Sequence, residues 1–315
     1  MEACHSQEQF NVTSYGATSV TIITFEAFAG MWINAFIVSV ICIAWVKRKT
    51  MNSNEKILLL LGSSRFWYLF ILWLYYFLLI MYPKYLYVHP TFQLLAGAQR
   101  LFNCFELSVS ACLSVFYCAK IANFRNSCFF YLKVKIDRMV PWLLLGSVFF
   151  SLVIGILAYE IIEKPQCNNS TGRENLWKVK IKTDEQFFPI YFITGFGYAT
   201  SFMAVILSVL LLLFSLWRHK RNMQTSSMKD LSMDAHIKAM KSILSFFVMY
   251  SINIISLIVT MIYSGEGKSA MMFLIYVFHY AFPGVHSLIL IFSNPKLKNT
   301  LLRILPCVKC KVCMR

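Results

Sequence analysis

The chain contains 315 residues, of which 58% are hydrophobic and 14% are charged, and its formal net charge is +16. Soluble globular proteins are nearer half apolar and a quarter charged, so this composition excludes a disordered chain, a secreted disulfide scaffold and an ordinary cytosolic enzyme. The apolar residues form long runs that Lys and Arg residues flank. This pattern indicates an integral membrane protein rather than one that binds nucleic acid.

Seven stretches of the sequence are long and apolar enough to cross a bilayer, for which a helix needs about 20 residues. They lie at 20–46, 57–82, 92–118, 141–162, 187–217, 240–263 and 270–292. The connections between them are short, and no segment is long enough for a second domain. We therefore predict one all-α domain over 20–292, a bundle of seven transmembrane helices, with residues 1–19 before it and 293–315 after it.

Lys and Arg concentrate in alternate connections, and this asymmetry predicts the orientation of the bundle. Residues 47–56, 119–140, 218–241 and the segment from 293 onward carry 21 of them, whereas the segments on the other side carry 7. Basic residues favour the cytoplasmic side, so we expect the N-terminus outside and the C-terminus inside. All three N-glycosylation sequons lie in segments predicted to be outside, at Asn11, Asn168 and Asn169.

Three cysteines near the C-terminus, Cys307, Cys310 and Cys313, have a spacing that superficially resembles a metal site. A zinc site needs a fourth ligand, which the neighbouring sequence lacks. Cysteines among lysines beside a membrane often carry palmitate, so palmitoylation and inert thiols are the two alternatives. Residues 296–306 place apolar side chains on one face, which predicts an interfacial helix on membrane lipid that ends at Pro306.

Ionisable residues inside the spans are candidates for function, because burying them in a membrane is costly. Arg65 is expected to form a buried polar clamp with groups such as Asn34. Arg100 and Glu106 either line a water-filled cavity or each bond a neighbouring helix. His279 and His286 are seven residues apart and share one face of the last span. No catalytic motif or phosphate-binding loop is present, so we expect neither an enzyme nor a cofactor.

Several motifs follow one another along the chain. They are LGSSR at 61–65, LSVFYCAKIANF at 113–124, SLWRHKRNM at 215–223, HIKAMKSILSF at 236–246 and HSLILIFSNPKLK at 286–298, together with Asn34. Seven spans with an external N-terminus already favour a G-protein-coupled receptor, and these motifs resemble those of the vertebrate bitter taste receptors, the type 2 taste receptor family. The resemblance implies a plasma-membrane receptor for bitter, mostly amphipathic small molecules that activates a heterotrimeric G protein of the gustducin (Gi-like) class.

The resemblance also implies two sets of site residues. The expected ligand-binding residues are Tyr76, Gln99, Asn103, Asn253, Tyr276, His279 and Tyr280. The expected coupling and switch residues are Asn34, Arg65, Lys120, Ile121, His219, His236, Lys238, Lys241 and Lys296. Two alternatives remain open, a pheromone-type chemosensory receptor and, from a different class, a seven-span channel or transporter.

Overall fold

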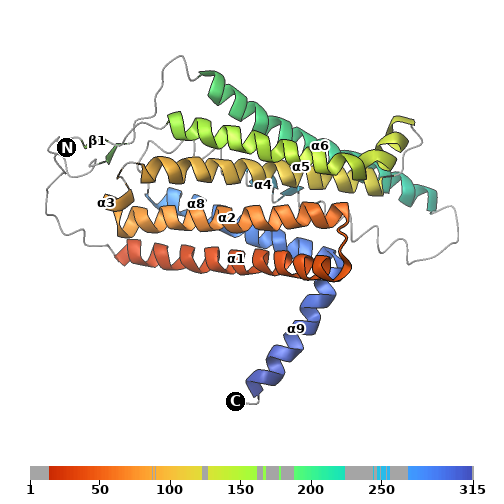
Figure 1. The fold of residues 1–315 in the computed structure, drawn as a ribbon, viewed down its shortest axis with the longest axis horizontal. Coiled ribbons are helices and arrows are strands. Elements are labelled where there is room, and N and C mark those ends of the chain that lie inside the picture. Colours follow the sequence, from red (N-terminus) through yellow and green to blue (C-terminus); the bar gives the residue numbers. More distant parts are fainter. Residues whose placement is uncertain are drawn as a thin grey trace.

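The computed structural model describes residues 14–86, 88, 90–122, 127–161, 166–167, 177–178, 188–223 and 269–313, together with 244, 247–248, 250–252 and 254–255. Within these residues, long helices lie side by side with their axes in broadly the same direction, while α6 and α8 are inclined (Figure 1). They are α1 (Ser14–Arg48), α2 (Ser53–Met81), α4 (Thr91–Ile121), α5 (Ser127–Ile161), α6 (Phe188–Met223) and α8 (Ser269–Ser293).

Six of these helices are long and apolar enough to cross a membrane. They contain six of the seven predicted spans, apart from a single end residue in three of them, and confirm the predicted helical bundle. The predicted span 240–263 lies mostly outside the described residues. Large apolar side chains on the bundle's surface, such as Trp32, Trp142 and Phe149, are each at least 70% exposed, as a surface facing lipid requires.

Helix α4 occupies the centre of the described bundle, because it packs against α2, α5 and α6. Helix α1 packs against α2 on one side and against α8 on the other. Two short elements lie at the same end of the bundle: α3 (Pro83–Leu86), and an antiparallel pair of strands that the sequence did not predict, β1 (Gln166–Cys167) and β2 (Trp177–Lys178). We call this the α3 end of the bundle.

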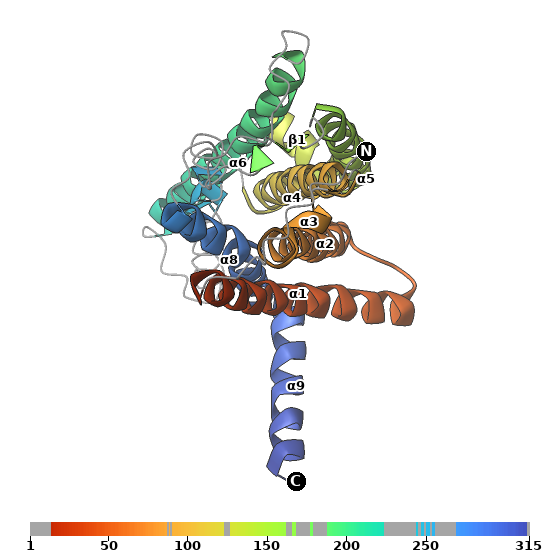
Figure 2. The same cartoon turned by 90° about the vertical axis from the view of Figure 1, so that its left-hand side faces the viewer.

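The opposite end of the bundle carries α9 (Pro295–Cys313), and we call it the α9 end. Helix α9 begins beneath a side-chain cap, since the Asn294 Oδ1 accepts hydrogen bonds from the backbone N–H of Lys296 at 3.0 Å and of Leu297 at 3.4 Å. It runs across the bundle axis and projects away from α1 (Figures 1 and 2). A helix in this direction lies in the plane of the membrane that the other helices cross.

The predicted end of this helix at Pro306 is wrong, because α9 continues to Cys313. Proline removes one backbone hydrogen bond and crowds the preceding turn, but it does not force a helix to end. The same fold contains Pro141 inside α5 and Pro283 inside α8. Helix packing and a membrane environment tolerate such prolines.

Candidate functional site

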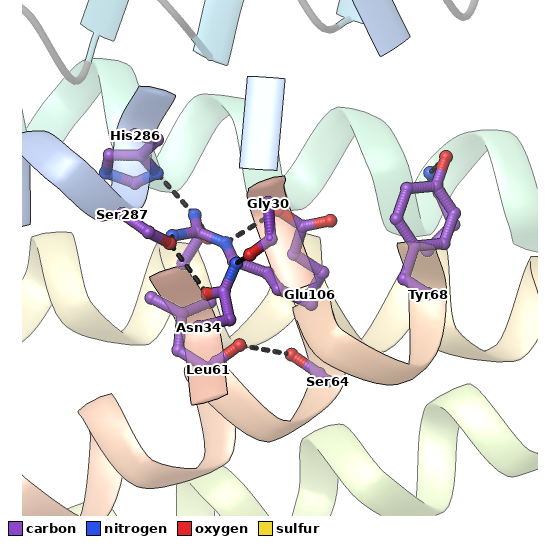
Figure 3. A network of polar contacts seen from close by, with 11 residues as sticks. Gly30, Asn34, Leu61, Ser64, Tyr68, Glu106, His286 and Ser287 are labelled. Atoms are coloured by element: carbon purple, nitrogen blue, oxygen red, sulfur yellow. Dashed lines mark hydrogen bonds and ion pairs between the residues drawn. The ribbon is translucent and has the colours of Figure 1, made fainter. Parts of the chain in front are cut away.

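A buried guanidinium on α2 is the centre of a polar cluster between the helices. Arg65 has no exposed surface, and its Nε donates to Glu106 Oε1 on α4 at 2.9 Å. Its Nη1 donates to Ser287 Oγ on α8 at 3.0 Å, and its Nη2 donates to Ser110 Oγ on α4 at 3.5 Å and to His286 Nδ1 on α8. All three guanidinium nitrogens therefore have partners, and one side chain joins three helices. Figure 3 shows the partners Glu106, Ser287 and His286 close together within the network.

The structure corrects the expected partner of Arg65. Arg65 does not bond Asn34, whose Oδ1 instead accepts from Ser287 Oγ at 2.7 Å while its Nδ2 donates to the Gly30 carbonyl at 2.8 Å. Among the described residues, Asn34 is therefore connected to Arg65 through Ser287. The chain of bonds from α2 through α8 to α1 makes this a clamp of four helices, because α4 supplies Glu106.

The structure decides between the two alternatives that the sequence left open for Glu106. It is buried and bonds a neighbouring helix, rather than lining a water-filled cavity. An ion pair of this kind stabilises a fold only while both charges remain present, because removing one partner leaves the other charge buried alone. Arg100 is half-buried on α4.

His286 takes part in the cluster as an acceptor. Arginine has no acceptor atom, so the Nδ1 of His286 must accept from the Arg65 guanidinium. The imidazole is therefore neutral and carries its proton on Nε2. This protonation state avoids a second positive charge beside Arg65 in an apolar environment.

Small residues let the helices that carry the cluster approach closely. A Cβ placed on Gly284 of α8 would lie 3.3 Å from the Cα of Gly30 on α1, and a Cβ on Gly30 would lie 2.7 Å from Leu69 Cδ1 on α2. Glycines at these positions bring the α1 and α8 backbones together, as is common between membrane helices. The contact lies one helical turn from both Asn34 and Ser287, so it sets the distance across which they bond.

Polar and aromatic residues of the expected ligand set lie between the Arg65 cluster and the α3 end. The Asn103 amide on α4 donates to Tyr68 Oη on α2 at 3.1 Å, and the Tyr68 ring lies 6.3 Å from the His279 ring on α8, measured between centroids. Asn103 Oδ1 and His279 Nδ1 are buried and accept or donate no hydrogen bond within the described part of the chain. Both atoms are unusual, since nearly all buried polar atoms find partners.

Three tyrosines of the expected ligand set form a neighbouring cluster. The Tyr76 ring lies 5.3 Å from that of Tyr276 and 6.5 Å from that of Tyr280, both in edge-on arrangements. Tyr76 Oη donates to Ser19 Oγ at 3.1 Å, and Tyr280 Oη donates to the Leu72 carbonyl at 2.6 Å. Gln99 is half-buried on α4, one turn from Asn103, and Asn253 lies outside the described residues.

Asn34 and Arg65 of the expected coupling and switch set belong to the buried cluster, whereas Lys120 and Lys296 lie at the α9 end, where an acid holds each of them. Lys120 Nζ is 2.6 Å from Asp137 Oδ2 on α5, and Lys296 Nζ is 2.6 Å from Glu55 Oε1 on α2. Glu55 also pairs with Arg48 at 2.5 Å. Glu55 is therefore a second hub, which ties the end of α1 and the start of α9 to α2.

The remaining expected residues have less structural description. Ile121 is half-buried in the last turn of α4, and His219 lies within α6, where only its backbone is described. The residues His236, Lys238, Lys241, Asn11, Asn168 and Asn169 lie outside the described residues. Cys307, Cys310 and Cys313 belong to α9, and their side chains are not described.

Two residues of interest were missed from the sequence. Tyr68 lies in an aromatic run where nothing distinguishes it from its neighbours, although it follows Arg65 by three residues and so shares a helix face with it. Glu26 is an acidic residue within the first predicted span, and its Oε2 is buried without a hydrogen-bond partner among the described residues. A count of acidic as well as basic residues inside the spans finds Glu26.

Comparisons with known proteins match nearly the whole chain. Residues 13–309 match the model of a protein family described as taste receptor protein (TAS2R). The human taste receptor type 2 member 2 is 31% identical over 305 residues, which cover 93% of this chain and 97% of that protein. Member 7 from Macaca mulatta is 31% identical, covering 89% and 90%, and member 105 from Mus musculus is 30% identical, covering 92% and 96%.

Proposed function

Since the chain belongs to the taste receptor (TAS2R) family, we propose that it is a bitter taste receptor of the plasma membrane, which binds bitter small molecules among its helices and activates a gustducin-class (Gi-like) G protein. The family match over residues 13–309 carries this proposal, because it includes every predicted span and every motif of the resemblance. In the proposed orientation, the α3 end faces the outside and the α9 end faces the cytoplasm.

Ligand binding is proposed for the residues between the Arg65 cluster and the α3 end. Asn103 and His279 offer buried polar atoms without partners, and Tyr76, Tyr276 and Tyr280 offer aromatic surface. Mostly apolar sites with a few polar groups suit amphipathic molecules, since the polar groups fix the orientation of a ligand that the aromatic surface binds. Gln99 and Asn253 complete the proposed set.

G-protein coupling is proposed for the α9 end, where Lys120, Ile121, His219 and Lys296 lie on α4, α6 and α9. His236, Lys238 and Lys241 belong to the same proposed surface. The basic residues also suit the negative inner leaflet, so charge alone does not carry the proposal. Its support is the motif in which each residue stands. A ligand shifts the receptor toward coupling only by binding the active arrangement more tightly than the resting one.

The test is calcium imaging of cells that express the chain with a promiscuous, gustducin-tailed G protein, screened against a panel of bitter compounds. We expect a saturable response to at least one compound. Asn103→Ala should weaken the response by shifting the concentration dependence, whereas Lys120→Ala should abolish it at equal surface expression. The two variants separate ligand binding from coupling.

The matched control for Lys120→Ala is Lys135→Ala, which removes an exposed lysine of α5 whose Nζ donates to Tyr131 Oη, four residues away in the same helix. It should leave the response unchanged. Silence to every compound, in cells with good surface staining, would contradict the bitter assignment and favour a pheromone-type chemosensory receptor. Ion or solute flux without agonist would favour a channel or transporter.

A further inference from the structure

Two hydrogen-bonded contacts join α2 to α4 in one continuous register. Arg65 pairs with Glu106, and three residues further toward the α3 end Tyr68 pairs with Asn103. An increase of three on α2 is matched by a decrease of three on α4, as antiparallel helices require. Residues three apart lie on the same face of a helix, about 4.5 Å apart along its axis. The two contacts are therefore adjacent rungs between the same two helices.

The rungs differ in what surrounds them. In the Arg65–Glu106 rung every guanidinium nitrogen of Arg65 has a partner, and the rung extends to α8 through Ser287 and His286. The Tyr68–Asn103 rung is buried but incompletely bonded, because Asn103 Oδ1 has no partner among the described residues. Asn103 Oδ1 can therefore accept a hydrogen bond from a molecule that binds beside this rung.

We propose that Tyr68 is a positioning residue, which transmits ligand occupancy at Asn103 to the Arg65–Glu106 ion pair. This inference rests on the proposed function, since it assumes that Asn103 meets the ligand. A ligand that donates a hydrogen bond to Asn103 Oδ1 draws the amide toward itself and loosens the bond from Asn103 Nδ2 to Tyr68 Oη. The helices then shift at the Arg65–Glu106 rung, where the hydrogen bond depends steeply on distance and angle. Because Arg65 also holds Ser287, the shift reaches α8 and, through Asn34, α1.

The decisive variant is Tyr68→Phe, which keeps the ring and removes only the hydroxyl that bonds Asn103. In the absence of ligand it imitates the loosened rung, so we expect agonist-independent G-protein activation to rise. One net hydrogen bond corresponds to a shift of about 2- to 10-fold. Asn103→Ala breaks the same rung from α4 and should raise basal activation similarly, although it weakens the response to agonist.

The matched control is Ser64→Ala, which removes another buried hydroxyl from α2. Ser64 Oγ donates to the carbonyl of Leu61 in its own helix at 2.9 Å and joins α2 to no other helix through that bond (Figure 3). Basal activation should therefore equal that of the unmodified receptor at equal surface expression. A rise in Ser64→Ala as large as that in Tyr68→Phe would overturn the proposal, because it would show a general effect of loosening α2.

A second measurement does not depend on ligand or G protein. The melting temperature of the purified receptor is compared for Tyr68→Phe, Glu106→Gln and the double variant. Coupled rungs give shifts that do not add, whereas independent rungs give additive shifts. Additive shifts, or unchanged basal activation by Tyr68→Phe in a receptor that responds to bitter compounds, would overturn the inference and leave the proposed function standing. If neither the unmodified receptor nor any variant activates a G protein, the proposed function is contradicted. The melting temperatures of the two single variants and the double variant still test whether the rungs are coupled.

Discussion

Gly284 of α8 faces Gly30 of α1 so closely that a Cβ on Gly284 would lie 3.3 Å from the Gly30 Cα. The neighbour in this contact is backbone, which cannot rotate away as the end of a side chain can. The two helices therefore approach as closely as they do only because both positions lack a side chain. Asn34 and Ser287 bond one another across the same interface at 2.7 Å.

Gly284→Ala should lower the melting temperature of the purified receptor, because the new methyl group separates α1 from α8 and stretches the Ser287–Asn34 bond. We expect a loss of about 1–3 kcal/mol in the free energy of unfolding, the usual cost of an overpacked contact. Gly146→Ala is the control, since a Cβ there meets nothing within 4 Å and alanine favours the helix. Equal melting temperatures for Gly284→Ala and Gly146→Ala would contradict the close contact.

Removing one charge of the Arg65–Glu106 ion pair should destabilise the protein more than removing both charges. Glu106→Leu leaves a buried guanidinium without its counter-ion, and breaking a buried pair in this way costs about 3–5 kcal/mol. Arg65→Met combined with Glu106→Leu removes both charges and should recover much of the lost stability. Surface expression and melting temperature measure the difference. A double variant less stable than Glu106→Leu alone would show that the pair itself, rather than charge balance, stabilises the bundle.

Asp137→Asn should release Lys120 without measurable loss of stability. The side chains of this pair are 38% and 50% exposed, and exposed ion pairs contribute between zero and about 1 kcal/mol. If Lys120 contacts the G protein, removing its intramolecular partner should lower the agonist concentration for half-maximal response by about 2- to 3-fold. Glu160→Gln, which neutralises an exposed acid elsewhere on α5, should leave that concentration unchanged. A weaker response in Asp137→Asn would show that the pair positions Lys120 for coupling.

Glu55→Gln should loosen the attachment of α9 to the bundle. Glu55 holds Lys296 and Arg48, and it accepts a hydrogen bond from the Asn52 N–H at 3.2 Å. Hydrogen exchange of the first two turns of α9 should rise several-fold, because opening of this segment then breaks fewer contacts. Lys296→Ala should reproduce the change. Unaltered exchange in both variants would mean that the apolar contact of buried Leu297 alone holds α9 in place.

The helical bundle could be predicted from the sequence because hydropathy alone reveals membrane-crossing segments. Helix ends were less accessible, since polar turns can extend a helix beyond the membrane. Helix α5 starts at Ser127 rather than near 141 and includes the charged residues from 133 to 138. Helix α9 likewise passes Pro306. Hydropathy measures what lies in lipid, and it does not measure how far a helix continues outside.

Individual residues of the buried polar cluster could be predicted from the sequence, but their pairs could not. Arg65 and Glu106 were each recognisable as costly residues in a membrane. Their pairing depends on how far α2 is shifted along α4, which a single sequence does not specify. The same shift brings Tyr68 to Asn103, so its importance also became visible only in the structure. Asn34 belongs to the same network, one bond further from Arg65 than expected.

The bonding of Arg65 also has a consequence for the order in which the protein is assembled during synthesis. Glu106 follows Arg65 by 41 residues, whereas Ser287 follows it by 222. The ribosome therefore delivers the counter-ion early and the hydroxyl and imidazole of α8 only near the end of translation. Until α8 has entered the membrane, the guanidinium lacks those partners in an apolar environment, where unmet donors are costly. Helix α8 therefore completes the polar cluster that begins with α2. In a nascent chain that stops before α8, Arg65 lacks Ser287 and His286 as acceptors.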